Sequence, residues 1–161
     1  MMKIKLTQGK VALVDDTDFM WLSRWKWHAH KDHENFYACR RVLSSLGVNE
    51  HLSMHRQILG LEFGDSRQGD HKNHNTLDNR RENIRIATLT QNRGNQKIRS
   101  GGTSKYKGVC WVKQRKKWHA QLAIKSKSKS LGFFMSERTA AFAYNLAAKK
   151  YFGKFALLNK I

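Results

Sequence analysis

The distribution of charge along the 161 residues is the feature that most constrains what this chain can fold into. Residues 101–161 carry fourteen Lys or Arg and one acidic residue, against nine and six in residues 1–60 and eight and five in residues 61–100. Tryptophans, phenylalanines and tyrosines are interleaved with the basic block, so it has enough apolar surface to fold, unlike a solvated tail. We therefore expect a folded module that binds phosphate groups in this region.

Length and composition exclude several classes of protein. A chain of 161 residues forms one ordinary domain or two to three very small ones, which rules out large barrel enzymes. No stretch approaches about 20 consecutive apolar residues, and the N-terminus lacks a signal-peptide apolar region, so we expect a cytoplasmic protein without membrane partners. Two cysteines cannot form a disulfide framework or a four-cysteine zinc site, so any metal must use oxygen or histidine ligands.

A cluster of Gly and Ser at residues 99–104 lies between two periodic segments and predicts a linker over residues 100–104. It separates residues 1–99 from a C-terminal domain over residues 105–161. Within the first part, residues 1–60 have the composition of a β-rich region, and residues 61–99 contain most of the Asn- and Asp-rich turns.

The N-terminal region contains several short strand patterns. Alternating residues 3–6 and the apolar run 11–14 predict a β-hairpin, followed by an acidic turn at Asp15 and Asp16. Residues 25–30 and 36–40 predict two strands that flank a turn at 31–35, and residues 51–55 predict another. Residues 54–59 favour a short helix that ends at Gly60.

The remaining elements follow from capping signals and periodicity. Residues 64–85 are rich in loop formers, residues 85–87 are strand-like, and Thr88 with Gln91 has the capping-box spacing that begins a helix. Residues 107–112, 117–124 and 130–134 predict three strands, and Ser136 begins a helix that ends at Gly153 and carries a stripe of alanines. We predict an α+β protein in which a small three-stranded antiparallel sheet packs against one helix.

Residues 69–92 combine the side chains that phosphodiester hydrolysis requires. An Asp70-His71 pair is followed by a turn, an Asn79-Arg80 pair, then Asn83, and finally Asn92 on a predicted helix. This run strongly resembles the core of phage-type HNH homing endonucleases, with Ile84 where Leu is usual. Residues 6–10, 14–16, 27–29 and 54–56 resemble the N-terminal region of small proteins of that family, so the resemblance extends the nuclease unit over residues 1–60 and implies a ββα-metal core at 61–99.

The resemblance implies a role for each residue of the motif. His71 is expected to be the general base, because an imidazole with an ordinary pKa near 6.5 is available in neutral form at physiological pH. Asn83 matches the position that holds this imidazole, with Asn79 as its rival. Asp70 and Asn92 match the metal ligands, and their hard oxygens favour Mg²⁺, with Mn²⁺ also supporting activity.

The C-terminal segment resembles the Apetala-two/ethylene-response-factor DNA-binding domain, at residues 104–109, 118–120, 131–134 and 140–153. That family lays its three-stranded sheet in the major groove, but its base-reading arginines are not carried over here. Gln121 can pair with adenine, and Trp111 is either a core residue or a DNA contact. The residues expected to contact DNA are Arg80, Arg81, Arg93, Lys107, Trp111, Lys113, Arg115, Lys116, Lys117, Gln121 and Lys125.

Together these patterns predict a divalent-metal-dependent HNH endonuclease that nicks or cleaves double-stranded DNA, as a monomer or as a dimer assembled on DNA. The resemblance implies a homing role in a bacterial or phage-infected host cell. Two alternatives remain open: a non-catalytic sequence-specific DNA-binding regulator, and an RNA-binding protein. His55 is either a structural hydrogen-bonding residue or a second catalytic group, His74 is either exposed or a phosphate contact, and Arg85 is either a DNA contact or the ion-pair partner of Glu82.

Overall fold

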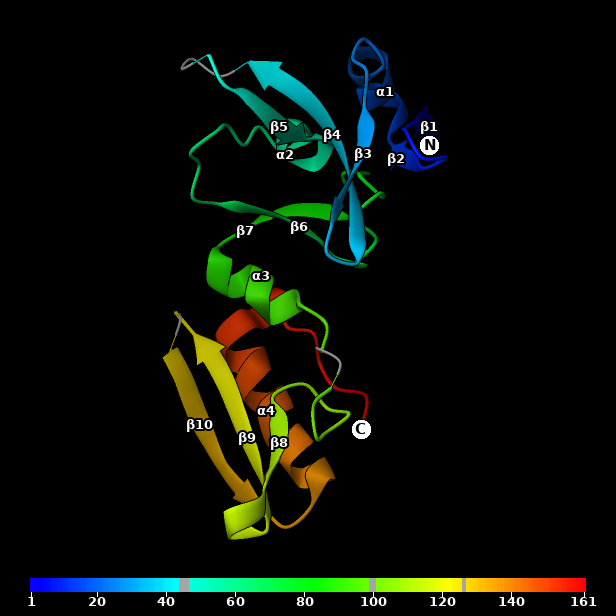
Figure 1. Ribbon diagram of the computed structural model, residues 1–161. Helices are drawn as coiled ribbons and strands as arrows, with labels where there is room; N and C mark the ends of the chain where they lie inside the picture. The colour runs from blue at the N-terminus through cyan, green and yellow to red at the C-terminus, as the bar shows by residue number, and fades with distance from the viewer. Residues whose placement is uncertain (44–46, 99–100, 126) are drawn as a thin grey trace. The chain divides into compact units, whose positions relative to one another are not determined.

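The computed structural model describes residues 1–43, 47–98, 101–125 and 127–161 (Figure 1). The chain forms two compact units, Met1–Ala87 and Thr88–Ile161, which are called unit 1 and unit 2 below. Both contain small antiparallel sheets and helices, so the predicted α+β class is confirmed. Within the described ranges, no helix is long and apolar enough to cross a membrane. The linker predicted over residues 100–104 begins outside the described residues and stays a prediction.

Unit 1 begins with the predicted hairpin, in which β1 (Met2–Lys5) pairs antiparallel with β2 (Val11–Val14). The acidic turn predicted after it is instead the start of a helix, α1 (Asp16–Leu22). Asp15 is its N-cap residue with an extended backbone, and Asp16 and Asp18 lie in the first turn. Negative charge in the first turn favours the positive end of the helix dipole, so the acidic cluster begins a helix here.

A three-stranded antiparallel sheet follows in the order β3-β4-β5, made of His28–Asp32, Asn35–Leu43 and Asn49–Ser53. The short helix α2 (Met54–Ile58) comes directly after β5. These elements confirm the predicted strands and helix, with shifted bounds. Gly60 has a φ of +66°, a conformation that glycine adopts without strain, and it ends the helical segment.

The core of unit 1 lies where the hairpin, α1, α2 and one face of the sheet meet. Trp27 is 5% exposed and donates its indole N–H to the carbonyl oxygen of Leu22 at 2.8 Å, so its polar atom is satisfied inside the core. The buried members of this core are Ile4, Leu6, Ala12, Val14, Leu22, Trp27, Ala29, Ala38, Met54, Ile58 and Ile84.

A two-stranded antiparallel sheet completes unit 1. It pairs β6 (Gln68–His71) with β7 (Ile84–Ala87), and the Asn- and Asp-rich loop 72–83 connects them. The strand β7 was expected at residues 85–87, whereas β6 falls in a segment expected to be loop. Its sequence of Gln, Gly, Asp and His has no apolar alternation, so its pairing depends on β7 rather than on its own pattern.

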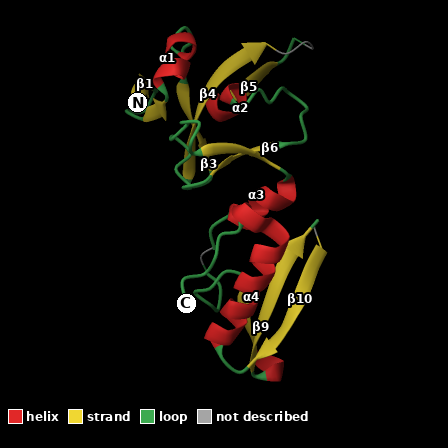
Figure 2. Ribbon diagram, turned by 180° about the vertical axis from the view of Figure 1, so that it is seen from behind, coloured by secondary structure: helices red, strands yellow, loops and turns green. Residues whose placement is uncertain are grey.

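Unit 2 contains the predicted helix α3 (Leu89–Asn95), and Thr88 and Gln91 form the expected capping box. A three-stranded antiparallel sheet follows in the order β10-β9-β8, from Lys127–Phe134, Lys117–Ile124 and Val109–Val112. Helix α4 (Glu137–Phe152) packs across one face of this sheet, as predicted (Figures 1 and 2). Ala140, Ala141 and Ala148 are fully buried, because small side chains let the helix approach the strands closely. Short 3₁₀ turns lie at Lys113–Arg115 and Gly153–Phe155.

Candidate active site

His71 lies at the end of β6, with its imidazole turned inward and only 6% exposed. Its Nε2 lies 3.3 Å from Oδ1 of Asn79, which belongs to the loop 72–83. Burial lowers the pKa of His71, while the hydrogen bond to Asn79 and the carboxylates of Asp70 and Asp78 oppose that shift. The lowered pKa keeps the imidazole neutral at neutral pH, which is the state that accepts a proton.

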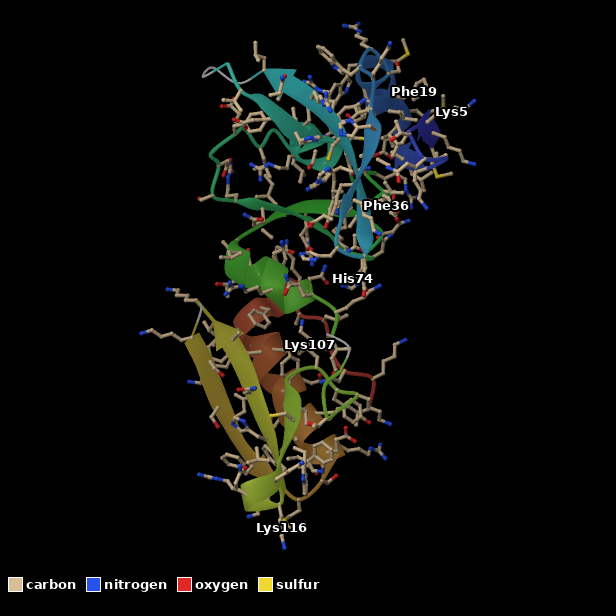
Figure 3. All side chains as sticks on the ribbon, viewed as in Figure 1. Lys5, Phe19, Phe36, His74, Lys107 and Lys116 are labelled. Carbon is tan, nitrogen blue, oxygen red and sulfur yellow. The ribbon has the colours of Figure 1, made fainter. Side chains whose placement is uncertain are left out.

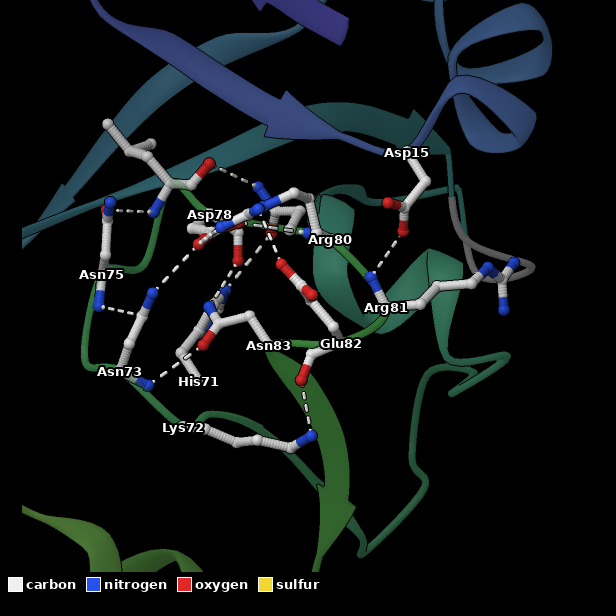
Figure 4. Close-up of polar contacts among 12 residues, drawn as sticks. Asp15, His71, Lys72, Asn73, Asn75, Asp78, Arg80, Arg81, Glu82 and Asn83 are labelled. Carbon is white, nitrogen blue, oxygen red and sulfur yellow. Dashed lines mark hydrogen bonds and ion pairs between the residues drawn. The ribbon is translucent and has the colours of Figure 1, made fainter. Parts of the chain in front are cut away.

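Asn83 has a different role from the one expected from the motif. Its Oδ1 accepts a hydrogen bond from the backbone N–H of Asn73 at 3.0 Å, and its Nδ2 donates to the carbonyl oxygen of Asp78 at 2.7 Å (Figure 4). Both ends of its amide therefore fix the loop. The predicted contact between Asn83 and His71 is corrected: Asn79, the rival considered for that role, makes it.

The loop is held by a charged network around Asp78, which is 2% exposed. Arg80 donates from Nε and Nη2 to the two carboxylate oxygens of Asp78, both at 2.8 Å, and Asn73 donates to Oδ2 at 2.9 Å (Figure 4). Strand β2 clamps the same loop, because Leu13 donates to the carbonyl oxygen of Leu77 and accepts from the N–H of Asn79, both at 2.8 Å. Asn79, which contacts His71, is therefore positioned by the N-terminal hairpin as well as by the loop 72–83.

A second buried imidazole, His55 of α2, lies against the first. The ring centroids of His55 and His71 are 4.8 Å apart, and the ring of Tyr37 lies 5.9 Å from that of His55. His55 is 7% exposed, and burial with the nearby His71 and Arg56 lowers its pKa to about 3. A Cβ at Gly69 would lie 2.2 Å from Cδ2 of His55, so only glycine leaves room for this ring.

The carboxylate of Asp70 is 5% exposed, and its Oδ2 pairs with Nε of Arg85 at 2.8 Å. Arg85 was expected either to contact DNA or to pair with Glu82; it pairs with Asp70, and Glu82 pairs with Arg80. A carboxylate offers about four acceptor positions, so the ion pair and the coordination of a hard cation are compatible. Asn92 lies on α3 in unit 2, and a shared cation between it and Asp70 stays a prediction.

Three basic residues expected on DNA form ion pairs or hydrogen bonds with other residues of the protein. Arg80 pairs with Asp78 and Glu82, and Arg81 donates to both carboxylate oxygens of Asp18 at 2.8 Å. Lys107 donates from Nζ to the carbonyl oxygens of Arg93 and Gly94 at the C-terminal end of α3, at 3.2 and 2.6 Å. Burial lowers the pKa of Lys107 to about 8. These contacts give the three residues structural roles, and their phosphate contacts stay a prediction.

The basic side chains around the β8–β9 turn of unit 2 are exposed. Lys116 lies at the tip of this turn with a left-handed backbone (Figure 3). Four exposed basic residues predicted to contact DNA lie at this turn or directly after it, Lys113, Arg115, Lys116 and Lys117, and a fifth, Lys125, lies between β9 and β10. Their side chains face solvent, as a contact with DNA phosphates requires.

The register of this sheet decides which face each side chain occupies. Trp111 is opposite Trp118, and Val109 is opposite Ala120, so all four share the face that packs on α4. The two indole rings meet edge to face at 5.1 Å. Trp111 therefore packs on Trp118 while staying half-buried, and a DNA contact of Trp111 stays a prediction. Gln121 lies on the opposite face, where its Oε1 accepts a hydrogen bond from Ser128 at 2.9 Å.

Sequence reasoning missed one cluster of potential metal ligands. His28, His30 and His51 have ring nitrogens that all lie within 4.8 Å of one another. The i, i+2 spacing of the first two predicts a shared strand face. The approach of His51 depends on strand register, which no local pattern signals.

Comparison with known proteins gives one distant relative. The chain is 28% identical over 154 residues to an uncharacterized HNH endonuclease of Acanthamoeba polyphaga mimivirus, a match that covers 96% of this chain and 77% of that protein. No family model matches the chain, and no solved structure matches it. The match spans both units, so it relates the whole chain, and not only the motif at residues 69–92, to a protein named as an HNH endonuclease.

Proposed function

We propose that this protein is a divalent-metal-dependent HNH endonuclease that nicks or cleaves double-stranded DNA. The observation that carries the proposal is the contact of Nε2 of His71 with Oδ1 of Asn79, next to the carboxylate of Asp70 on the same strand. The distant relationship to an HNH endonuclease supports the same class of reaction. In chain order, β6, β7 and α3 provide the β–β–α sequence of such a core.

The proposed general base is His71. An amide oxygen accepts hydrogen bonds and cannot donate them, so Asn79 selects the tautomer in which Nε2 carries the proton. We therefore assign proton abstraction from the attacking water to Nδ1. Burial keeps the ring neutral, and the buried Asp78 near it stabilises the imidazolium that forms when the proton is taken up.

Asp70 and Asn92 are the proposed ligands of the divalent cation, Mg²⁺ by preference and Mn²⁺ as a substitute, because both offer hard oxygens. When bound, the ion would polarise the scissile phosphate and stabilise the charge on the departing oxygen. The ion pair with Arg85 holds the Asp70 carboxylate in one orientation. Asn92 follows the capping box of α3 by one residue, so its position depends on a well-defined helix start.

Unit 2 is the proposed DNA anchor, similar in its sheet and helix to the Apetala-two/ethylene-response-factor domain. The exposed side chains Lys113, Arg115, Lys116, Lys117 and Lys125 would hold phosphates, and Gln121 would face bases. Arg93 on α3 is proposed as a further phosphate contact. Counterion release then makes duplex affinity fall steeply, by about 10³-fold or more between 50 and 200 mM salt if six or more phosphates are contacted. A chain with one active site nicks one strand, and two copies on one target would cut both.

The proposal is tested with supercoiled plasmid and Mg²⁺. The unaltered chain is expected to relax the plasmid, and chelation of the metal is expected to stop it. His71→Ala should lower the rate by about 10²–10⁴-fold, the usual contribution of a general base. His33→Ala is the matched control, because this histidine has a side chain that is 93% exposed. If the His71→Ala variant relaxed the plasmid as fast as the unaltered chain, the role of His71 would be refuted. If the unaltered chain bound duplex DNA but did not relax the plasmid, the nuclease assignment would be refuted and a DNA-binding regulator would be favoured.

A further inference from the structure

Three histidines outside the proposed active site meet on one face of the β3-β4-β5 sheet. His28 and His30 are alternate residues of β3 and share a face, and His51 belongs to β5. The register pairs His28 with Cys39 of β4, and Cys39 with Ser53 of β5. The imidazoles of the two outer strands therefore approach each other over β4, on the face opposite the hydrophobic core.

The distances between the ring nitrogens are close to those of a metal site. Nε2 of His28 lies 3.1 Å from Nδ1 of His51, and the rings of His30 and His51 have centroids 4.9 Å apart. Two nitrogens on one tetrahedral Zn²⁺, each at about 2.0–2.1 Å, are about 3.3 Å apart. The first pair already has this spacing. All three ligand atoms lie within 4.8 Å of one another, so His30 has to move closer to the other two to share an ion with them.

Charged groups of the same sheet face this cluster: Arg41 lies opposite His51 in the register, and Asp32 ends β3. His30 and His51 also border a cavity of about 260 Å³ that Asp32 lines, which leaves room for water as a fourth ligand. Cys39, which pairs with His28 in the register, is 2% exposed, and its Sγ lies 3.5 Å from Oγ of Ser53.

We propose that His28, His30 and His51 form a binding site for a transition-metal ion of the Zn²⁺ class, distinct from the proposed Mg²⁺ site at Asp70. Three nitrogen donors select Zn²⁺, Co²⁺, Ni²⁺ or Cu²⁺ over Mg²⁺ and Ca²⁺, which prefer oxygen. The bound ion links β3 directly to β5 across β4. The site therefore stabilises unit 1 and does not depend on nuclease activity.

The test uses the full chain without an affinity tag. Titration with Co²⁺ is followed by visible absorption, and Zn²⁺ binding is measured by calorimetry and by competition with Co²⁺. One ion per chain is expected, with the absorption of a tetrahedral nitrogen site. At a Zn²⁺ concentration about 100-fold above the dissociation constant, the Tm should rise by about 5–10 °C.

The variants His28→Gln and His51→Gln should bind Zn²⁺ at least about 100-fold more weakly, since losing a group that only supports a ligand already costs about 10–100-fold. His33→Gln, on the β3–β4 turn, is the matched control and should bind normally. If either variant fails to fold by circular dichroism, His30→Gln replaces it, because His30 is exposed. Absence of stoichiometric binding, or binding that survives these substitutions but is lost in His71→Ala, would overturn the proposal.

Discussion

The buried imidazole of His55 predicts that unit 1 loses stability in mild acid. Its pKa is about 3 in the folded protein, against 6.5 when the chain is unfolded. Between these values the unfolded chain binds more protons, so the free energy of unfolding rises with pH, and this contribution is complete above pH 6.5. It falls by about 1.4 kcal/mol per pH unit below that value, which gives a loss of about 2 kcal/mol at pH 5 and about 5 kcal/mol at pH 3.

Other titratable groups of unit 1 do not mask the effect of His55 on the free energy of unfolding between pH 6.5 and 4.5. Burial also lowers the pKa values of His71 and His28, so both add to the loss in the same direction. Asp78, whose pKa is lowered mainly by the hydrogen bonds from Arg80, contributes only as the pH falls below its ordinary value of 3.8. The decline between pH 6.5 and 4.5 therefore reports on buried histidines and not on carboxylates.

The assay is native-state hydrogen exchange in increasing urea at pH 7.5 and pH 5, read separately on peptides of unit 1 and unit 2. The His55→Gln variant removes the titrating group, so its loss of stability between the two pH values should be about 2 kcal/mol smaller than that of the unaltered chain. His33→Gln, on an exposed side chain, should behave like the unaltered chain. An equal loss with and without His55, or the same loss in peptides of unit 2, would refute the reasoning.

Three further substitutions test contacts described above. Gly69→Ala would bring a Cβ to 2.2 Å from the neighbouring imidazole, so urea unfolding should show a loss of about 1–3 kcal/mol; Gly102→Ala, which meets only an ordinary contact at 3.6 Å, is the control, and equal effects would contradict the steric argument. Arg81→Ala removes the two guanidinium donors from the carboxylate of Asp18, which is 2% exposed. The free energy of unfolding in urea should fall by about 2 kcal/mol. An unchanged unfolding midpoint would show that the ion pair is dispensable. Lys107→Met removes the donor from two carbonyl oxygens at the end of α3 and should cost about 1 kcal/mol, seen as faster hydrogen exchange in that helix; unaltered exchange would count against this role.

Elements with a strong local pattern could be predicted from the sequence. Helix α4 carries its alanines at helical spacing, and α3 begins at the capping box of Thr88 and Gln91. The strand β6 could not be predicted, because Gln-Gly-Asp-His has neither apolar alternation nor β-branched residues, and only its partner strand makes it extended. The helix α1 was missed because Asp15 and Asp16 suit a turn as well as a helix start.

The candidate site was predictable in its residue types and less so in its contacts. The motif indicated an amide beside His71, but two asparagines four residues apart satisfy the same pattern, and only the course of the loop brings Asn79 to the ring. Arginines near an active site suggest phosphate contacts, yet Arg80 pairs with its sequence neighbours Asp78 and Glu82. Arg81 pairs with Asp18, which is 63 residues away and lies close only after folding. The histidine cluster depends on strand register, which sequence patterns fix poorly.

The clamp between Leu13 and residues 77–79 bears on how such a motif can be transplanted. Asn79, whose side-chain amide orients His71, donates its backbone N–H to the carbonyl oxygen of Leu13, in a hairpin more than sixty residues upstream in the chain. A designer who grafts only residues 68–95 onto another scaffold would carry over every polar side chain of the motif and lose the brace that aligns them. The minimal portable module therefore includes the first fourteen residues, even though none of them carries any of the chemistry.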